Sequence, residues 1–219
     1  NYFNLFSIML LFSLINACTD NDKKEFYTNE DFEKIPKTDI HLHIESPDSK
    51  YMELASRYNF RVVSPNVDAG TSLDNQLAAA SELKRNWPNQ FTFLGTFSVD
   101  EYGDSTFAEN IIKRIELCLA EGASGIKIWK NIGMTLKNSS GQYVMVDDPE
   151  FDPVFKYIED NKIPLMGHLG EPLNCWLPLE QMTDSGNYRY FKSHPEYHMY
   201  LHPEAPSYED QINARDHLL

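Results

Sequence analysis

Hydrophobic residues follow two alternating periods between residues 37 and 168. They recur at every second position in short segments, as in half-buried strands, and at every third or fourth position in longer segments, as in amphipathic helices. The period of two predicts strands over residues 37–45, 60–67, 91–99, 125–129 and 163–168. The helical period covers residues 48–59, 72–87, 107–121 and 150–161. Strands that alternate with helices predict parallel strands joined by right-handed crossovers, in either an open sheet or an eightfold barrel.

Local signals mark the ends of these helices. Asp48 is a start signal for the first helix, Pro88 ends the second, and Gly122 stops the third. Near the end of the sequence, Ser207 is placed to cap a further helix over residues 207–219. The 36 positions before it, 171–206, show no sustained period and are expected to form a long loop.

The first residues have the pattern of an export signal. No charged residue occurs from Tyr2 to Ala17, and the sequence turns sharply polar after Cys18. The apolar run is shorter than the ~20 residues that a membrane-spanning helix needs. Residues 15–18 resemble the lipobox of bacterial lipoproteins, which implies a lipid on Cys18. We therefore expect a signal peptide over residues 1–18, a polar tether over 19–32 and a domain over 33–219, exported and anchored to the membrane of a bacterial cell envelope.

Composition limits the functions open to this domain. The chain has 219 residues, 42% of them hydrophobic, which is typical of one globular domain with a sizeable core. Its formal net charge of -14 argues against a nucleic-acid partner, because phosphate contacts need clustered lysine and arginine. The three cysteines, at positions 18, 118 and 175, lie far apart, and we expect no structural disulfide. Cys118 falls on the apolar stripe of its helix and is expected in the core.

The segment KTDIHLHIE, residues 37–45, carries the candidate chemistry. If it is a strand, Asp39, His41 and His43 point to one side and the apolar residues between them to the other. Two imidazoles that point the same way suit a metal ion, since zinc binds neutral imidazole nitrogen and a nearby carboxylate can orient the ring.

His168 and Lys127 extend this candidate site. His168 ends the fifth predicted strand, and strand ends of one sense gather at one edge of a parallel sheet, so three histidines from two strands can meet there. Lys127 alternates with two isoleucines, which turns it to the interior if they face the helices. Burial disfavours the charged form of a lysine and favours its neutral amine, which can be carbamylated and then bind a metal ion. Lys130 is the competing inward residue if the register is reversed.

The motifs TDIHLH, GIKIWK and GHLGEP, in this order, resemble the amidohydrolase superfamily, in particular its branch of amidohydrolase-related hydrolases and decarboxylases. The resemblance covers the sequence from Lys37 onward. It implies a TIM-type (β/α)8 barrel with one or two divalent ions, which we expect to be zinc. It also implies that His41, His43 and His168 are metal ligands and that Lys127 can be a carbamylated one.

The sequence departs from that family in its later part. The family also uses a histidine after the sixth strand and an aspartate after the eighth, as ligand and proton shuttle, and neither strand is visible here. The resemblance therefore implies an incomplete barrel of about the first five β/α units, with the catalytic aspartate absent. The loop over residues 171–206 is expected to contact substrate, with Glu171, Trp176 and Arg189 as candidates. Its histidines at 194, 198 and 202 are expected on the surface.

These observations predict a metal-dependent hydrolase in which a metal-bound hydroxide attacks an amide, ester or lactone carbonyl of a small molecule. A truncated, inactive form of that enzyme stays open. So do a metal-dependent nonoxidative decarboxylase on the same scaffold and a noncatalytic ligand-binding lipoprotein. The sequence leaves the oligomeric state undetermined.

Overall fold

The computed structural model describes residues 27–48 and 50–218, and divides them into a short unit that ends at Ile35 and a second unit over residues 36–219. The expected signal peptide and the expected lipidation site, Cys18, lie outside the described residues. None of the helices that are described combines the length and the apolar character needed to cross a membrane.

The first unit contains helix α2 (Asn29–Lys34), which begins inside the segment expected to be a tether. Thr28 and Asp31 form a capping box, because the Thr28 hydroxyl accepts from the Asp31 amide and the Asp31 carboxylate accepts from the Thr28 amide. Within the described part of this segment, the polar sequence therefore supports a short helix, none of whose residues is buried.

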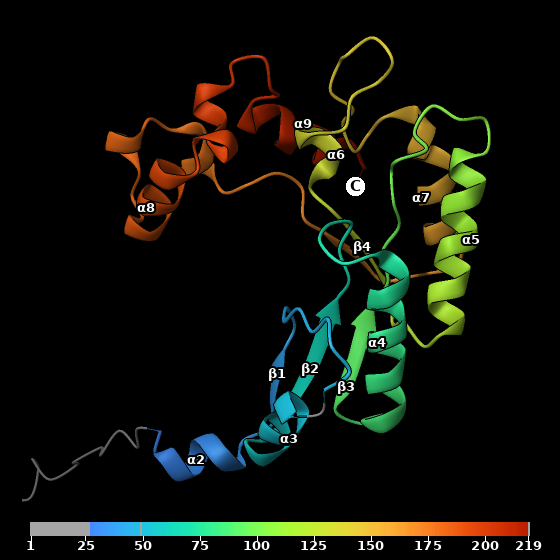
Figure 1. Cartoon of the computed structure of the whole chain (residues 1–219), viewed down its shortest axis with the longest axis vertical. Coiled ribbons are helices and arrows are strands. Elements are labelled where there is room, and N and C mark those ends of the chain that lie inside the picture. Colours follow the sequence, from blue (N-terminus) through green and yellow to red (C-terminus); the bar gives the residue numbers. More distant parts are fainter. Residues whose placement is uncertain (1–26, 49, 219) are drawn as a thin grey trace, which may run out of the picture. The chain divides into compact units, whose positions relative to one another are not determined.

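The second unit is a mixed α/β fold made of parallel β-α-β units, and its described strands form no closed barrel. The strands are β1 (Lys37–Asp39), β2 (Phe60–Pro65), β3 (Phe91–Leu94), β4 (Ile126–Ile128) and β5 (Leu165–Gly167). β1, β2 and β3 pair in that order, and β4 pairs with β5, all in parallel (Figure 1). Gly95 links the two groups, since its carbonyl accepts from the Lys127 amide at 2.7 Å. Each strand therefore lies next to the strand before it in sequence.

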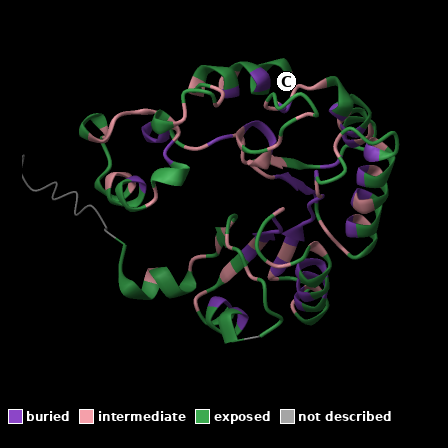
Figure 2. Cartoon of the chain, turned by 45° about the horizontal axis from the view of Figure 1, so that its top comes forward, coloured by how far each residue is buried: buried purple, intermediate pink, exposed green. Residues whose placement is uncertain are grey.

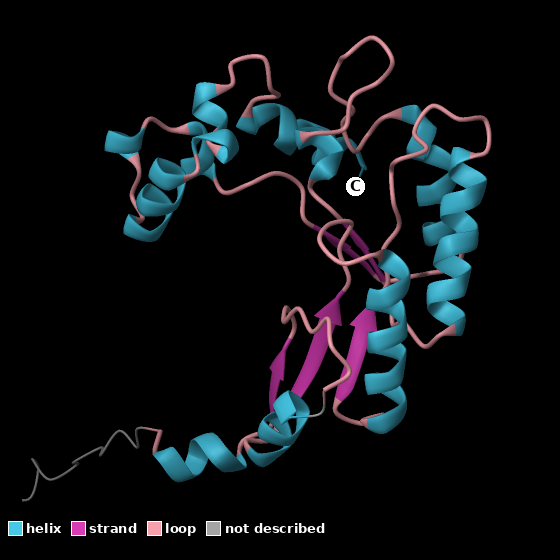
Figure 3. Cartoon of the chain, in the orientation of Figure 1, coloured by secondary structure: helices cyan, strands magenta, loops and turns pink. Residues whose placement is uncertain are grey.

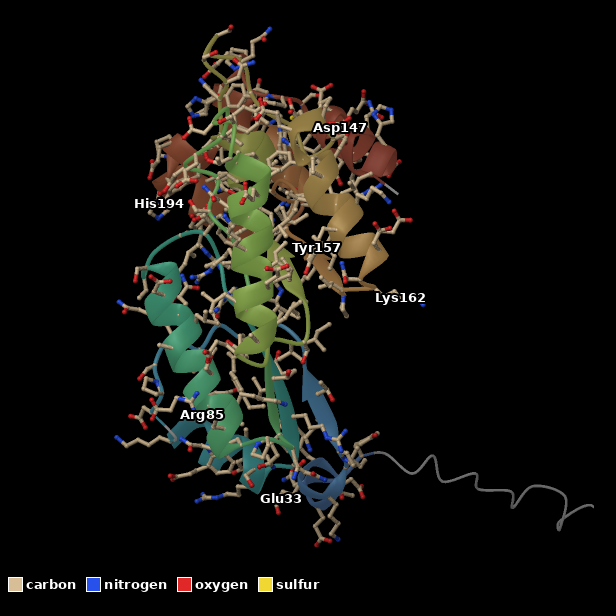
Figure 4. All side chains as sticks on the ribbon, turned by 90° about the vertical axis from the view of Figure 1, so that its right-hand side faces the viewer. Glu33, Arg85, Asp147, Tyr157, Lys162 and His194 are labelled. Atoms are coloured by element: carbon tan, nitrogen blue, oxygen red, sulfur yellow. The ribbon has the colours of Figure 1, made fainter. Side chains whose placement is uncertain are left out.

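Helices connect these strands, as the alternating periods predict (Figure 3). They are α3 (Lys50–Arg57), α4 (Leu73–Asn86), α5 (Phe107–Ala120) and α7 (Asp152–Asp160), the last preceded by the 3-10 turn Pro149–Phe151. Apolar side chains from strands and helices form one core in which Leu83, Phe93, Ile115 and Val154 are completely buried. In Figure 2 the buried positions, in purple, gather on the strands and along one side of the helices. Helices α5 and α7 lie side by side (Figure 4). The Tyr157 hydroxyl of α7 donates a hydrogen bond to the Glu116 carboxylate of α5 at 3.2 Å.

The strand predicted over residues 37–45 forms a regular ladder only at Lys37–Asp39. Asp39 is the reason, because its carboxylate accepts from the His41 amide at 3.0 Å, and such local bonds compete with ladder pairing. Beyond it, the Leu42 amide still donates to the Val63 carbonyl at 3.3 Å and the Ile44 amide to the Ser64 hydroxyl at 3.0 Å. The HLH segment is therefore held against the carboxyl end of β2 by isolated hydrogen bonds and not by a continuous ladder.

The predicted loop over residues 171–206 has more structure than expected. It contains α8 (Ser185–Ser193), capped by the Asp184 side chain, and the 3-10 turns Leu173–Trp176, Leu179–Gln181, Pro195–Tyr197 and Met199–Leu201. The prediction that His198 lies on the surface is wrong. Its ring is 2% exposed, stacks on Phe191, and lies 2.8 Å from the Leu177 carbonyl through Nε2.

Two further helices complete the second unit. α6 (Asn131–Met134) directly follows β4, and α9 (Tyr208–Leu218) is the predicted last helix, with Ser207 accepting from the Asp210 amide as its cap. Gln211 of α9 is buried and donates to the Gly133 carbonyl at 2.8 Å. This bond attaches the last helix to the segment after β4.

Cys118 is completely buried in the core, as predicted, and Cys175 is buried in the segment after β5. Both are free thiols. The Cys175 thiol donates to the Tyr197 carbonyl at 3.1 Å, and burial raises its pKa to about 11. Cys175 is therefore a structural thiol with little nucleophilic character at neutral pH.

Gln76 of α4 organises the loop that follows β2. Its side chain accepts from the Val67 amide at 2.9 Å and donates to the carbonyls of Val67, Ala69 and Thr71. Replacing Gln76 with leucine leaves these buried backbone groups without hydrogen-bond partners, so we expect the free energy of unfolding to fall by about 2–4 kcal/mol. Urea denaturation measures this loss. Asn75→Leu, on the exposed side of the same helix, is the control, and a Gln76→Leu loss as small as that of the control would contradict the prediction.

Candidate metal centre

Segments at the carboxyl ends of three strands bring the predicted site residues together. His41 and His43 follow β1, Lys127 lies in β4, and His168 directly follows β5. The Nζ atom of Lys127 lies 2.9 Å from Nε2 of His41, although 86 residues separate them in sequence. The rings of His41 and His43 meet edge to face with centroids 5.1 Å apart. His41, His43 and Lys127 therefore form one cluster.

The surroundings of His43 fix its tautomer. Its Nδ1 lies 2.9 Å from the Pro65 carbonyl at the end of β2, so the Nδ1 hydrogen is donated to that oxygen. Nε2 then carries the lone pair. This is the usual arrangement of a metal-ligating histidine, in which the second ring nitrogen is held by a carbonyl or carboxylate.

Lys127 lies on the interior side of β4, as the alternation with the two isoleucines predicts. Ile126 and Ile128 pack in the core, whereas the Lys127 side chain, which is completely buried, reaches His41. Burial lowers the pKa of the Lys127 amine, and it also lowers the pKa of His41, with Lys127 adding to that effect. Both shifts favour neutral nitrogen, which is the form that binds metal ions.

His168 is joined to this cluster through Trp129, a residue that the sequence did not single out. The rings of Trp129 and His168 meet edge to face at 4.9 Å, and Lys127 Nζ lies 5.6 Å from the Trp129 ring centre. Burial lowers the pKa of His168, and its Nδ1 is buried without a hydrogen-bond partner. A buried ring nitrogen in that state is one that a bound ion would satisfy.

These donors fit a divalent metal in their chemistry, because they include three imidazoles, an amine of lowered pKa and a buried ring nitrogen that has no hydrogen-bond partner. Their arrangement is not yet a coordination shell. Within residues 27–48 and 50–218, no three histidine, cysteine, aspartate or glutamate side chains are close enough together to hold a metal ion. A metal would therefore bind only after side chains of the cluster turn toward it.

The three candidate substrate contacts differ in position. Glu171 pairs with Lys130 and lines a cavity beside Trp129. Trp176 packs against Tyr208 and donates from its indole nitrogen to the Pro206 carbonyl at 3.0 Å, and Arg189 is exposed on α8. Neither Trp176 nor Arg189 is among the residues that line this cavity.

Asp68 connects three of the strand-end loops. It follows β2 and accepts from the Val99 amide after β3 at 3.3 Å and from the Asn131 side chain after β4 at 2.6 Å. Burial raises its pKa. Sequence reasoning missed this carboxylate, whose only signal was its position just after a predicted strand.

Asp68 should make stability depend on pH. Because its folded pKa lies above the ordinary value of 3.8, the folded chain holds the proton more tightly than the unfolded chain. We expect the wild type to lose stability relative to Asp68→Asn as pH rises from 3.8 through the folded pKa. Denaturant titrations of both proteins between pH 4 and 7 measure the difference. A difference that stays constant over this range, or grows in favour of the wild type, would contradict the expectation.

Comparisons with protein-family models, curated proteins and solved structures find no match to this chain. The arrangement of the site residues is therefore the basis for assigning a function.

Proposed function

We propose that this chain is a metal-dependent hydrolase of the amidohydrolase type, acting on the carbonyl group of a small-molecule amide, ester or lactone. One observation carries the proposal. The buried Lys127 of β4 contacts His41, which follows β1, and His43 and His168 lie beside them near the carboxyl ends of parallel strands. In α/β folds of this kind, the carboxyl ends of the strands are where substrates bind.

The strand order supports a barrel as the underlying architecture. Five parallel strands follow one another as neighbours, without the reversal of order that a doubly wound sheet contains at its centre. This sequential order is the one that the first five units of a (β/α)8 barrel would have. In such a barrel His41, His43, Lys127 and His168 would share one mouth.

His41, His43 and His168 would hold the metal, with Lys127 as a further ligand if it is carbamylated. The expected ion is zinc, which would lower the pKa of a bound water to ~7 and polarise the substrate carbonyl. The protein's own groups prepare the site. The Pro65 carbonyl orients His43, desolvation lowers the pKa values of His41, His168 and Lys127, and the Lys130–Glu171 pair lies beside the cluster.

The proposed location is the outside of a bacterial membrane, to which a lipid on Cys18 would anchor the domain. This part of the proposal rests on the apolar segment before Cys18 and on the polar one after it. Mass spectrometry of the mature N-terminus tests it. An acylated cysteine at position 18 is the expected result, and a mature protein that retains residues 2–17 would overturn it.

Metal and product analysis test the enzymatic proposal. The protein is purified without added metal, its zinc, manganese and iron are quantified, and it is assayed against a panel of simple amides, esters and lactones. We expect about one or two ions per chain and release of a carboxylic acid, both lost after chelation and restored by metal. Release of carbon dioxide would point to a decarboxylase instead. A chain that binds a small molecule but no metal would remove the enzyme proposal.

A further inference from the structure

A cavity of about 410 Å³ lies next to the candidate metal centre. The segments that follow β4 and β5 line this cavity, and Trp129 lies between it and the cluster of His41, His43 and Lys127. The same indole that contacts His168 and approaches Lys127 therefore also faces this cavity. Its volume lies within the range of about 300–1,000 Å³ that is usual for small-molecule sites.

Aromatic rings and thioethers supply the apolar lining of the cavity. They come from Trp129, Met134, Tyr143, Tyr197 and Met199. Aromatic side chains bind other rings through offset or edge-to-face contacts, and methionine sulfur adds favourable contacts with ring edges. The lining is therefore suited to a flat ring of the substrate.

The lysines and glutamates that line the cavity each already have a partner. Lys130 pairs with Glu171, and the Lys137 ammonium lies 4.3 Å from the centre of the Tyr143 ring. Glu196 pairs with His194 at 3.3 Å. Two lysines and two glutamates thus contribute no net charge, and a charged ligand would have to compete with these contacts. An uncharged ligand would leave them in place.

We propose that this cavity is the acyl-side subsite of the enzyme and that it binds an uncharged aromatic ring attached to the scissile carbonyl group. Trp129 places the ring on one side of the indole and the reacting group on the side of His168. The assignment of the ring to the acyl side rests on the proposed hydrolase function. Binding of the ring in the cavity does not depend on catalysis.

Binding is measured first, with chelator-treated full-length protein, so that no turnover interferes. The probes are 3-phenylpropanamide, its aliphatic counterpart butanamide, and the charged 3-phenylpropanoate, with dissociation constants from ligand-observed NMR. We expect the aryl amide to bind at least tenfold more tightly than butanamide and no more weakly than the carboxylate. Tyr197→Ala and Tyr143→Ala should each weaken aryl amide binding at least fivefold. Tyr51→Ala, a tyrosine on α3 away from the cavity, should leave it unchanged.

Tyr197 is 53% exposed, so its replacement should leave the fold intact, and thermal unfolding of each variant verifies this. Equal binding of the aryl amide and butanamide would overturn the proposal. So would aryl binding that is unchanged in both folded cavity variants, and so would a clear preference for the carboxylate.

Turnover is measured second, with the metal-loaded protein and two methyl esters that share the methanol leaving group. We expect kcat/KM for methyl 3-phenylpropanoate to exceed that for methyl butanoate about tenfold, and this ratio to fall to about twofold or less in Tyr197→Ala. Equal rates for both esters would refute the subsite and leave the hydrolase standing. Aryl binding that depends on Tyr197, without hydrolysis of any ester, would refute the hydrolase and keep the ring site.

Discussion

Replacing His43 with alanine is expected to abolish metal retention and to lower kcat/KM of the loaded protein about a thousandfold or more. His43 is the histidine whose tautomer is fixed, through its bond to the Pro65 carbonyl, with the Nε2 lone pair available. Its loss would remove a donor that no other described side chain replaces at that position. Metal content after gel filtration and ester hydrolysis after metal addition are the two measurements.

The fold should survive this substitution because His43 is exposed and contributes one hydrogen bond to the protein. His194→Ala is the matched control. This histidine lies on the segment after β5, where it pairs with Glu196 (Figure 4). Its replacement should preserve metal content. If His43→Ala retained a full complement of metal and wild-type activity, the HLH segment would not be part of the active centre.

We expect Lys127→Met to preserve the stability of the fold and to lower the activity of the enzyme. The lysine is completely buried, and burial lowers its pKa, so its charged form is costly in the fold. Methionine is flexible and apolar and can occupy the buried space of the lysine side chain. We expect the free energy of unfolding to stay the same or to rise by about 1 kcal/mol, because an apolar side chain there carries no desolvation cost. Activity of the metal-loaded enzyme should fall about a hundredfold.

Denaturant unfolding and steady-state kinetics of the same preparations measure these two effects. Lys156→Met, at an exposed position on α7, is the control and should change neither quantity by much. A strong loss of stability in Lys127→Met would mean that the amine has a structural role through His41. Full activity in a stable Lys127→Met protein would exclude lysine from the reaction.

Sequence reasoning located the regular elements because their apolar positions are periodic. The alternation of Ile126, Lys127 and Ile128 was sufficient to place Lys127 on the interior side of β4, since both isoleucines had a helical layer to pack against. The pattern predicts the HLH segment at the end of its strand, as the structure has it, but it also predicts strand pairing as far as residue 45, whereas β1 ends at Asp39. The bond from the His41 amide to Asp39, a local interaction without a periodic signature, limits that ladder.

The segment after β5 was the least predictable part. α8 buries only Phe191, so its sequence shows no apolar stripe, although Asp184 could have been read as its cap. His198 is buried because its ring stacks on Phe191 and its Nε2 contacts the Leu177 carbonyl, 21 residues away in sequence, and neither contact follows a periodic pattern. Trp129 and Asp68 were missed for a similar reason. Their importance comes from partners on other loops, His168 for one and Asn131 for the other.

The order of the strands also bears on how the chain acquires its structure. β2, β3 and β5 each pair with the strand before them, and an isolated bridge from Gly95 links β4 to the end of β3, so strand pairing requires only loop closures within single β-α-β units. A chain that emerges with its amino terminus first can therefore form one strand after another, starting with β1 and β2, before later segments have emerged. The contact between Lys127 and His41 spans 86 residues and can form only after β4 has been added, and His168 joins the site only after β5. The chemistry of the site would thus be the last property to mature.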